Sequence, residues 1–305
     1  MTESISGATE IYGLIGDPVK HSYSPRMMNA AFSSMNLDAR YLAFQVKAEE
    51  VSKAIAGIRA LNVAGVNVTV PHKSSVIPYL DEVTPLAKKI RAVNTISNVK
   101  GHLTGTNTDF SGFIRSLKTL NFSPKNKTIA ILGSGGSARA LLAGLADAGA
   151  LSVIVHNRTA ARAEKLVTEF SQYFSQTKLE AVSLQTIHET PLDLLVNTTT
   201  VGMFSSDIPV DLKECRKISL LADIIYSPRQ TSLLKQAEEL GITAVNGIGM
   251  LLYQGCEAFT FWTGKQAPEE VMRNQLLSLI EGLESFFPCR YHLNLIPPKK
   301  MKTHL

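Results

Sequence analysis

The first half of the chain alternates short strand-like segments with longer amphipathic ones. Strand-like segments carry polar and β-branched residues in alternation, whereas helix-like segments repeat apolar residues every three or four positions. Pro25 suits the first turn of the first helix, where a proline is tolerated. The pattern predicts strands at 11–16, 39–46 and 64–70, helices at 25–36, 49–61, 73–80, 84–90 and 110–120, and a hairpin at 94–107.

The second half begins with a strand, a glycine-rich loop, a helix and a second strand within residues 126–159. This layout is typical of a dinucleotide-binding βαβ unit. Further strands are predicted at 192–199, 220–226 and 242–247, with helices between them, and two strong helices at 250–264 and 268–286. The tail after these helices contains two prolines and no periodicity, so we expect it to be flexible. The succession of strands and helices predicts an α/β fold.

Glycines follow the first strand of the βαβ unit at the positions that a bound dinucleotide requires. Gly133, Gly135 and Ala138 form the pattern G-x-G-x-x-A. The first glycine permits a tight turn, the second lets the backbone approach a pyrophosphate, and the alanine allows close packing of helix on strand. The pyrophosphate would bind to free N–H groups at the start of the helix. The pattern alone is weak, but its place between a strand and a helix favours a cofactor site.

The second strand of the unit ends at Asn157, and Arg158, Thr159 and Arg162 follow it. A site for NAD usually carries an acidic residue here, which binds the ribose 2′-hydroxyl. Two guanidinium groups one helical turn apart, with no carboxylate beside them, favour the 2′-phosphate of NADP instead. The alternative is that both arginines are exposed residues at the start of a helix.

A lysine follows the third predicted strand, in the segment NVTVPHK. Asn67 and Thr69 alternate with valines, and Pro71 should end the strand because it cannot donate to a sheet. Lys73 then lies beyond a strand end, where ligands bind in α/β proteins. It is either a solvated lysine at a helix start or a group held for chemistry. His72 should point to the opposite side as a structural residue.

Composition and charge narrow the function. The chain has 305 residues, of which 45% are hydrophobic and 19% are charged, enough for two domains of ordinary size. Lys299, Lys300 and Lys302 supply three of the net +5 charges, so the rest is only mildly basic, and no basic stripe predicts nucleic-acid binding. We see no membrane span and no secretory signal. Three widely spaced cysteines predict a reducing compartment, the cytoplasm, without disulfides or a metal site.

Six motifs follow one another along the chain: GDPVKHSYSP (16–25), GVNVTVPHK (65–73), AVNT (92–95), GTNTD (105–109), GSGGSARA (133–140) with NRT (157–159), and NGIGMLLYQG (246–255). Through these motifs the chain resembles shikimate dehydrogenase from about residue 11 to about residue 285. Together they are highly specific, whereas the second half alone would indicate only a generic dinucleotide-binding protein.

The resemblance implies an N-terminal α/β substrate domain, a Rossmann-like domain that binds NADP, and C-terminal helices that return to the first domain. The substrate domain would comprise 1–109 and 246–305, and the NADP domain 110–245. The implied activity is the reversible, NADP-dependent oxidation of shikimate at its 3-hydroxyl to 3-dehydroshikimate, a step of aromatic amino-acid biosynthesis. This chemistry requires no metal, and we expect a monomer or a homodimer.

Carried over position by position, the resemblance also implies the site residues. Lys73 and Asp109 resemble the catalytic pair, although Asp109 could instead cap the helix that follows it. The hydroxyls of Ser22 and Ser24 resemble the pair that contacts the substrate carboxylate, and His21 beside them is given no role. The full substrate set is Ser22, Ser24, Asn67, Thr69, Lys73, Asn94, Asp109, Tyr226 and Gln254. The cofactor set is Gly133, Ser134, Gly135, Gly136, Ser137, Ala138, Asn157, Arg158, Thr159, Arg162 and Gly247.

Two positions depart from the family pattern, and two rival functions stay open. Met28 stands where the family often has histidine, and Arg91 where a glycine is common. Neither belongs to the residues assigned to chemistry. The enzyme could prefer quinate or accept both acids, although the two serine hydroxyls suit the shikimate type. It could also be a non-catalytic NADP-binding sensor, against which the intact Lys73 and Asp109 count.

Overall fold

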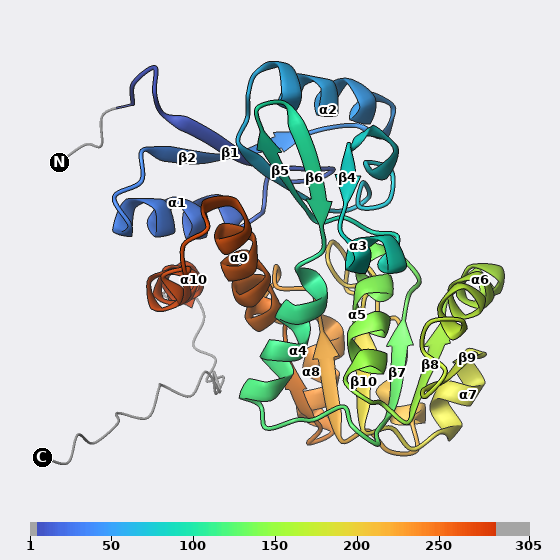
Figure 1. Ribbon diagram of the computed structural model, residues 1–305. Coiled ribbons are helices and arrows are strands. Elements are labelled where there is room, and N and C mark those ends of the chain that lie inside the picture. Colours follow the sequence, from blue (N-terminus) through green and yellow to red (C-terminus); the bar gives the residue numbers. More distant parts are fainter. Residues whose placement is uncertain (1–4, 285–305) are drawn as a thin grey trace, which may run out of the picture.

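Two β-sheets organise the chain, and the computed structural model describes residues 5–284. Figure 1 shows one sheet above the other, with helices α4 (Asp109–Thr119) and α9 (Ile248–Thr263) between them. They are named the first and the second sheet, in chain order. Both are accompanied by helices, so the α/β class predicted from the sequence is confirmed. Within the described part of the chain, no helix is long and apolar enough to cross a membrane.

The first sheet has the strand order β2-β1-β3-β5-β6-β4. β1 runs parallel to both of its neighbours, whereas β5 and β6 form the antiparallel hairpin predicted at 94–107. The turn of this hairpin passes through Lys100 and Gly101, which both have positive φ, as a tight hairpin turn requires. The strands are β1 (Glu10–Gly16), β2 (Ala39–Gln45), β3 (Gly65–Val68), β4 (Glu82–Val83), β5 (Thr95–Val99) and β6 (His102–Thr106).

The prediction of one helix beside this sheet is wrong. Where the sequence predicted a helix at 73–80, turns are followed only by a short 3-10 helix, η2 (Ile77–Tyr79). Pro78 accounts for the difference, because a proline lacks an N–H group and disfavours helical backbone at the preceding residue. The remaining helical elements are α1 (Ser24–Ser34), η1 (Ala48–Glu50), α2 (Val51–Ala60) and α3 (Pro85–Ile90).

The second sheet is entirely parallel, with the order β12-β11-β10-β7-β8-β9. Counted from β7, this is the 3-2-1-4-5-6 order of the Rossmann fold, and the order reverses between β7 and β10. The sequence does not predict the edge strand β9, because its residues, KLEA, are not an apolar run. The strands are β7 (Thr128–Leu132), β8 (Ser152–His156), β9 (Lys178–Ala181), β10 (Leu194–Asn197), β11 (Leu220–Asp223) and β12 (Thr243–Val245).

Helix α5 (Gly136–Asp147) begins at the glycine loop and packs closely against α4. A side-chain carbon at Gly144 would lie 3.3 Å from the carbonyl oxygen of Phe110, so a small residue is needed at this crossing. This contact holds the second half of α5 against the first turn of α4, where Asp109 lies. The other helices of this half are α6 (Ala160–Ser171), α7 (Leu184–Glu189), η3 (Leu212–Glu214) and α8 (Ser232–Glu239).

The two C-terminal helices, α9 and α10 (Glu269–Glu284), pack on the first sheet and α1, as Figure 1 shows. The indole N–H of Trp262 donates to the carbonyl of Ile96 at 2.9 Å, and the rings of Phe259 and Phe32 lie 5.5 Å apart. These contacts confirm the predicted return of the chain to its first half. The tail that we expect to be flexible lies outside the described residues.

The two departures from the family pattern have different surroundings. Met28 is fully buried in the core between α1 and the first sheet. Arg91 ends α3 in the left-handed conformation, with φ of 54°, which is why a glycine is favourable at this position. Its guanidinium lies 3.0 Å from the carboxylate of Glu169 on α6 and so links the two sheet layers.

Candidate active site

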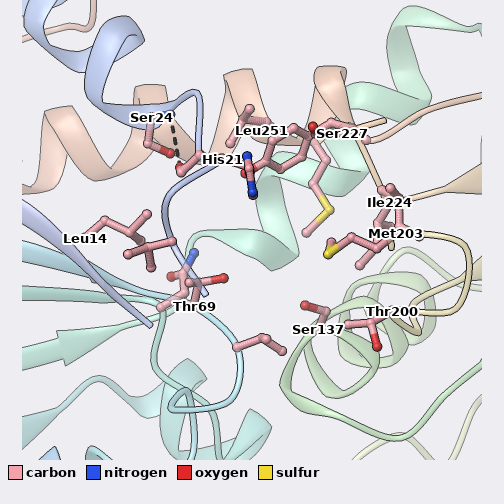
Figure 2. Close-up of a pocket in the computed structure, with 18 of the residues that line it drawn as sticks. Leu14, His21, Ser24, Thr69, Ser137, Thr200, Met203, Ile224, Ser227 and Leu251 are labelled. Atoms are coloured by element: carbon pink, nitrogen blue, oxygen red, sulfur yellow. Dashed lines mark hydrogen bonds between the residues drawn. The ribbon is translucent and has the colours of Figure 1, made fainter. Parts of the chain in front are cut away.

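A cavity of about 610 Å³ lies between loops of the two sheets. Figure 2 shows Thr69 of the first sheet's loop opposite Ser137 and Thr200 of the second. Ligands of α/β proteins bind at such carboxyl ends of strands. All nine residues of the predicted substrate set line this cavity; they are Ser22, Ser24, Asn67, Thr69, Lys73, Asn94, Asp109, Tyr226 and Gln254.

Lys73 and Asp109 form a buried ion pair in the wall of the cavity. The distance from Nζ of Lys73 to Oδ2 of Asp109 is 2.5 Å, and the side chains are only 11% and 6% exposed. The interpretation of Lys73 as a solvated lysine is therefore wrong. Such a pair can exchange a proton with a hydroxyl group bound beside it, and its positive member can stabilise a developing alkoxide.

The carboxylate of Asp109 faces the cavity and does not cap α4. Its Oδ1 accepts a hydrogen bond from the amide of Asn94 at 2.9 Å, and its Oδ2 accepts one from Lys73. The backbone N–H groups of Asp109 and Phe110 donate instead to Oδ1 of Asn107, at 3.1 and 3.3 Å. Because Asn107 satisfies the helix start, the carboxylate remains available for chemistry.

Two buried amides hold their orientation through hydrogen bonds within the protein. The amide NH2 of Asn94 donates to Asp109 and to Thr108, so both of its hydrogens are used. The amide oxygen of Asn67 accepts from the hydroxyl of Tyr41 at 2.7 Å. Burial raises the pKa of Tyr41 well above its usual value, so this phenol keeps the proton that it donates. Tyr41 thus holds Asn67 in place, and no sequence motif indicates this role.

The two serines of the HSYS segment lie at the start of α1. Ser24 is the first residue of this helix, and its backbone N–H donates to Oγ of Ser22 at 3.2 Å. Tyr226 lines the cavity with them, and burial raises the pKa of its phenol, an effect that a hydrogen bond with Ser22 opposes. Hydroxyl groups beside a helix N-terminus form a suitable environment for a carboxylate.

Gln254 reaches the cavity from α9, because α9 packs very closely on α4. A side-chain carbon at Gly112 of α4 would lie 2.6 Å from the backbone nitrogen of Gln254, so only glycine permits this approach. The amide NH2 of Gln254 donates to the carbonyl of Leu251 at 2.8 Å. This bond orients the side chain at the cavity wall.

The glycine loop has the geometry that the sequence predicts for a bound dinucleotide. Gly133 follows β7 with φ of +108°, a conformation that favours glycine. A side-chain carbon at Gly135 would meet open space, so a ligand can approach the backbone there. Ala138 is fully buried on the sheet side of α5. The first N–H groups of α5 lack intrahelical partners and can bind an anion.

The residues of the cofactor set are spread over two cavities. Ser137 and Gly247 line the large cavity, and Gly247 must be glycine because a side-chain carbon would lie 1.9 Å from the carbonyl oxygen of Ile224. Ser134 and Arg162 line a second cavity of about 560 Å³, together with Arg91, Arg139 and Lys165. Asn157, Arg158 and Thr159 lie between β8 and α6, and neither cavity includes them.

Several lining residues were not predicted. Thr198, Thr199 and Thr200 follow β10 directly, at the point where the strand order reverses, so the position of this predicted strand end was a usable signal. The buried Asn197 accepts hydrogen bonds from the N–H and the hydroxyl of Thr199 and so holds the loop. Asp17, His21 and Met250 also line the cavity and belong to the motifs at 16–25 and 246–255, whereas Met203 lines it without a motif that would indicate it. His72, which the sequence analysis expects to be structural, does not line the cavity. It is buried, and its Nε2 lies 2.6 Å from the carbonyl oxygen of Val46.

The chain is similar in sequence and in structure to known proteins. Three family models match the chain: the shikimate dehydrogenase substrate binding domain at 14–96, shikimate/quinate 5-dehydrogenase at 116–201, and the shikimate 5′-dehydrogenase C-terminal domain at 247–277. The shikimate dehydrogenase (NADP(+)) of Geobacter metallireducens is 43% identical over 287 residues, which are 91% of this chain and 99% of the relative.

Solved structures extend the likeness to three dimensions. A shikimate dehydrogenase in complex with NADP+ superposes with a TM-score of 0.82 at 38% identity, and the match covers 91% of this chain and 98% of that one. The enzyme of Thermus thermophilus in complex with NADP(H) and shikimate has a TM-score of 0.79 at 34% identity, over 88% and 98% of the two chains. With this identity over nearly the whole length of its relatives, the chain belongs to the shikimate dehydrogenase family.

Proposed function

We propose that this chain catalyses the reversible, NADP-dependent oxidation of shikimate to 3-dehydroshikimate. The observation that carries the proposal is the buried pair of Lys73 and Asp109, which lies in the same cavity wall as Ser137 of the glycine loop. This arrangement brings a proton-transfer group next to a dinucleotide site, as an alcohol dehydrogenation requires. The activity that the relatives' names state supports the same reaction.

The proposed chemistry separates a hydride from a proton. NADP+, held by the glycine loop, would supply the acceptor for the hydride, that is, for the hydrogen of the alcohol carbon with its bonding electron pair. The proton of the 3-hydroxyl passes to the Lys73–Asp109 pair, and in the reverse direction the pair returns it to the oxygen of the ketone. Lys73 also stabilises the negative charge that develops on that oxygen. The geometry favours a shared role for the two groups, since their reacting atoms are 2.5 Å apart.

Substrate binding divides between the carboxylate and the ring hydroxyls. We propose that the hydroxyls of Ser22 and Ser24 bind the carboxylate at the start of α1, with the neutral phenol of Tyr226 beside them. Asn67, Thr69 and Gln254 would bind ring hydroxyls from around the cavity, and each carries a short polar group there. The amide hydrogens of Asn67 are already donated to Asn94 and Thr95, so Asn67 would bind a ring hydroxyl through its amide oxygen. Both amide hydrogens of Asn94 are donated as well, and one of them goes to Asp109, so Asn94 acts chiefly by holding that carboxylate.

NADP binding is proposed to follow the glycine loop. The backbone from Gly133 to Ala138 would bind the pyrophosphate, and the backbone of Gly247, which lines the large cavity, would contact the nicotinamide end. Arg158 and Arg162 would bind the 2′-phosphate beyond β8, supported by Asn157 and Thr159. We propose further that the two sheets belong to two domains, 1–109 with 246–305 and 110–245. A monomeric or homodimeric state and a cytoplasmic location stay predictions.

A steady-state assay of the purified chain tests the proposed function. Shikimate and quinate are each supplied with NADP and with NAD, and reduction of the cofactor is followed by its absorbance. We expect the highest kcat/KM for shikimate with NADP. A preference for quinate would make the chain a quinate dehydrogenase, and no turnover with either acid would favour the non-catalytic sensor.

Replacing Ser22 by alanine should raise the KM for shikimate about tenfold and change kcat much less. A contact with the remote carboxylate is made equally in the ground state and the transition state, so its loss weakens binding rather than chemistry. The magnitude is that of one hydrogen bond to a charged group. Ser33→Ala, at an exposed position of the same helix, is the matched control. A large fall in kcat at constant KM would show that Ser22 has another role.

A further inference from the structure

The loop assigned to the cofactor contacts the lysine assigned to catalysis. Ser137 is the second residue of α5, and its Oγ accepts a hydrogen bond from Nζ of Lys73 at 3.2 Å. The two residues are 64 positions apart, and Lys73 follows β3 of the first sheet whereas Ser137 follows β7 of the second. In Figure 2, Ser137 lies on the wall of the cavity opposite Thr69.

The stem of Lys73 packs against the same turn of α5. A side-chain carbon at Gly136 would lie 2.9 Å from Cβ of Lys73 and 3.1 Å from its Cδ, so glycine is what allows the stem to approach. Lys73 is therefore held by Gly136 along its stem and by Asp109 and Ser137 at its ammonium group. Two of these three contacts come from the glycine loop and its helix.

We propose that Ser137 is a positioning residue for Lys73, and that through it the cofactor loop sets the direction of the catalytic ammonium group. An ammonium group has three hydrogens. Asp109 and Ser137 accept two of them, which fixes the direction of the third and leaves it for the oxygen of the substrate. This inference rests on the proposed function, because it assigns a role to the lysine of that reaction.

The hydroxyl and the backbone of Ser137 can be tested separately. Its N–H belongs to the first turn of α5, where N–H groups lack helical partners and can bind the pyrophosphate. Alanine keeps this N–H and removes only the hydroxyl. A substitution to alanine should therefore affect Lys73 while NADP binding changes little, and threonine should restore the hydroxyl.

The experiment is a double-mutant cycle between Ser137 and Lys73, measured with shikimate and NADP. Ser137→Ala should lower kcat about three- to tenfold, the effect of one hydrogen bond, with little change in either KM. Ser137→Thr should recover most of the loss. In the Lys73→Ala background the same Ser137→Ala change should have no further effect, because Ser137 acts only through the lysine. The primary isotope effect with shikimate deuterated at C3 should increase in Ser137→Ala, since the chemical step becomes slower.

The control is Ser171→Ala, which removes a serine whose hydroxyl bonds only within α6. It should leave kcat and both KM values unchanged. An equal loss from Ser137→Ala in both backgrounds, or a loss that appears only in the KM for NADP, would show that Ser137 serves the cofactor and would overturn the inference. Wild-type kcat in Ser137→Ala would overturn it as well. Failure of the proposed function is distinguishable, because the wild-type chain would then not turn over shikimate.

Discussion

Replacing Lys73 by alanine is expected to lower kcat about 10²- to 10⁴-fold, the range of a lost general acid or base. The KM for shikimate should change much less, because a contact made in the transition state lowers kcat and kcat/KM together. The fold should survive, since the lysine lies in a cavity wall and its removal opens space rather than filling it. Removing one partner of a buried pair does cost stability, so unfolding must be measured alongside turnover.

The companion variants separate charge from shape. Asp109→Asn keeps the shape of the carboxylate and removes its charge, so it should also reduce kcat strongly. The amide oxygen of the new side chain can still accept the hydrogen bond from Asn94. Lys47→Ala, at an exposed lysine after β2, is the matched control and should behave like the wild type. Turnover of Lys73→Ala close to that of the wild type would mean that the buried pair is structural and that the catalytic assignment fails.

Replacing both Arg158 and Arg162 by alanine is the second change from which we expect a large effect. The KM for NADP should rise about 10- to 150-fold, which corresponds to about 1.5–3 kcal/mol for a charge-assisted hydrogen bond. The KM for NAD should change little, because NAD has no 2′-phosphate for the guanidinium groups to bind. The preference between the two cofactors should therefore become smaller.

A charge-matched control is available on the same sheet. Arg216 and Lys217 are exposed and precede β11, at the opposite end of the sheet from the glycine loop. Replacing this pair by alanine also removes two positive charges, and it should leave the preference for NADP over NAD unchanged. An unchanged preference in the variant without Arg158 and Arg162 would assign the 2′-phosphate to other cations, of which Arg91, Arg139 and Lys165 in the second cavity are the candidates.

Local sequence patterns predict the elements and the strand ends but not the contacts between distant loops. The glycine loop was predictable because a turn with φ of +108° at Gly133 and open space above Gly135 require particular residues at particular positions. The burial of Lys73 was not, because its partner Asp109 is 36 residues away and reaches it only through the packing of α4. The same holds for Tyr41, which orients Asn67 from another strand.

The errors of the sequence analysis also have physical causes. The pattern at 73–80 has helical spacing, but Pro78 prevents a regular helix there. The sequence also left open that Asp109 caps the following helix. This alternative was not an adopted prediction, and the hydrogen bonds show that Asn107 takes the role of the cap. β9 lies at the edge of the second sheet, where a strand can be polar because one side is not covered by another strand.

The fate of the hydrogen at C3 of shikimate tests the proposed reaction most directly. Shikimate deuterated at C3 is incubated with the purified wild-type chain and NADP, and both products are analysed by mass spectrometry and NMR. We expect the deuterium in NADPH, and an organic product whose new ketone at C3 is conjugated with the ring double bond. Deuterium that stays on the ring, or a ketone at another carbon, would contradict the proposed reaction.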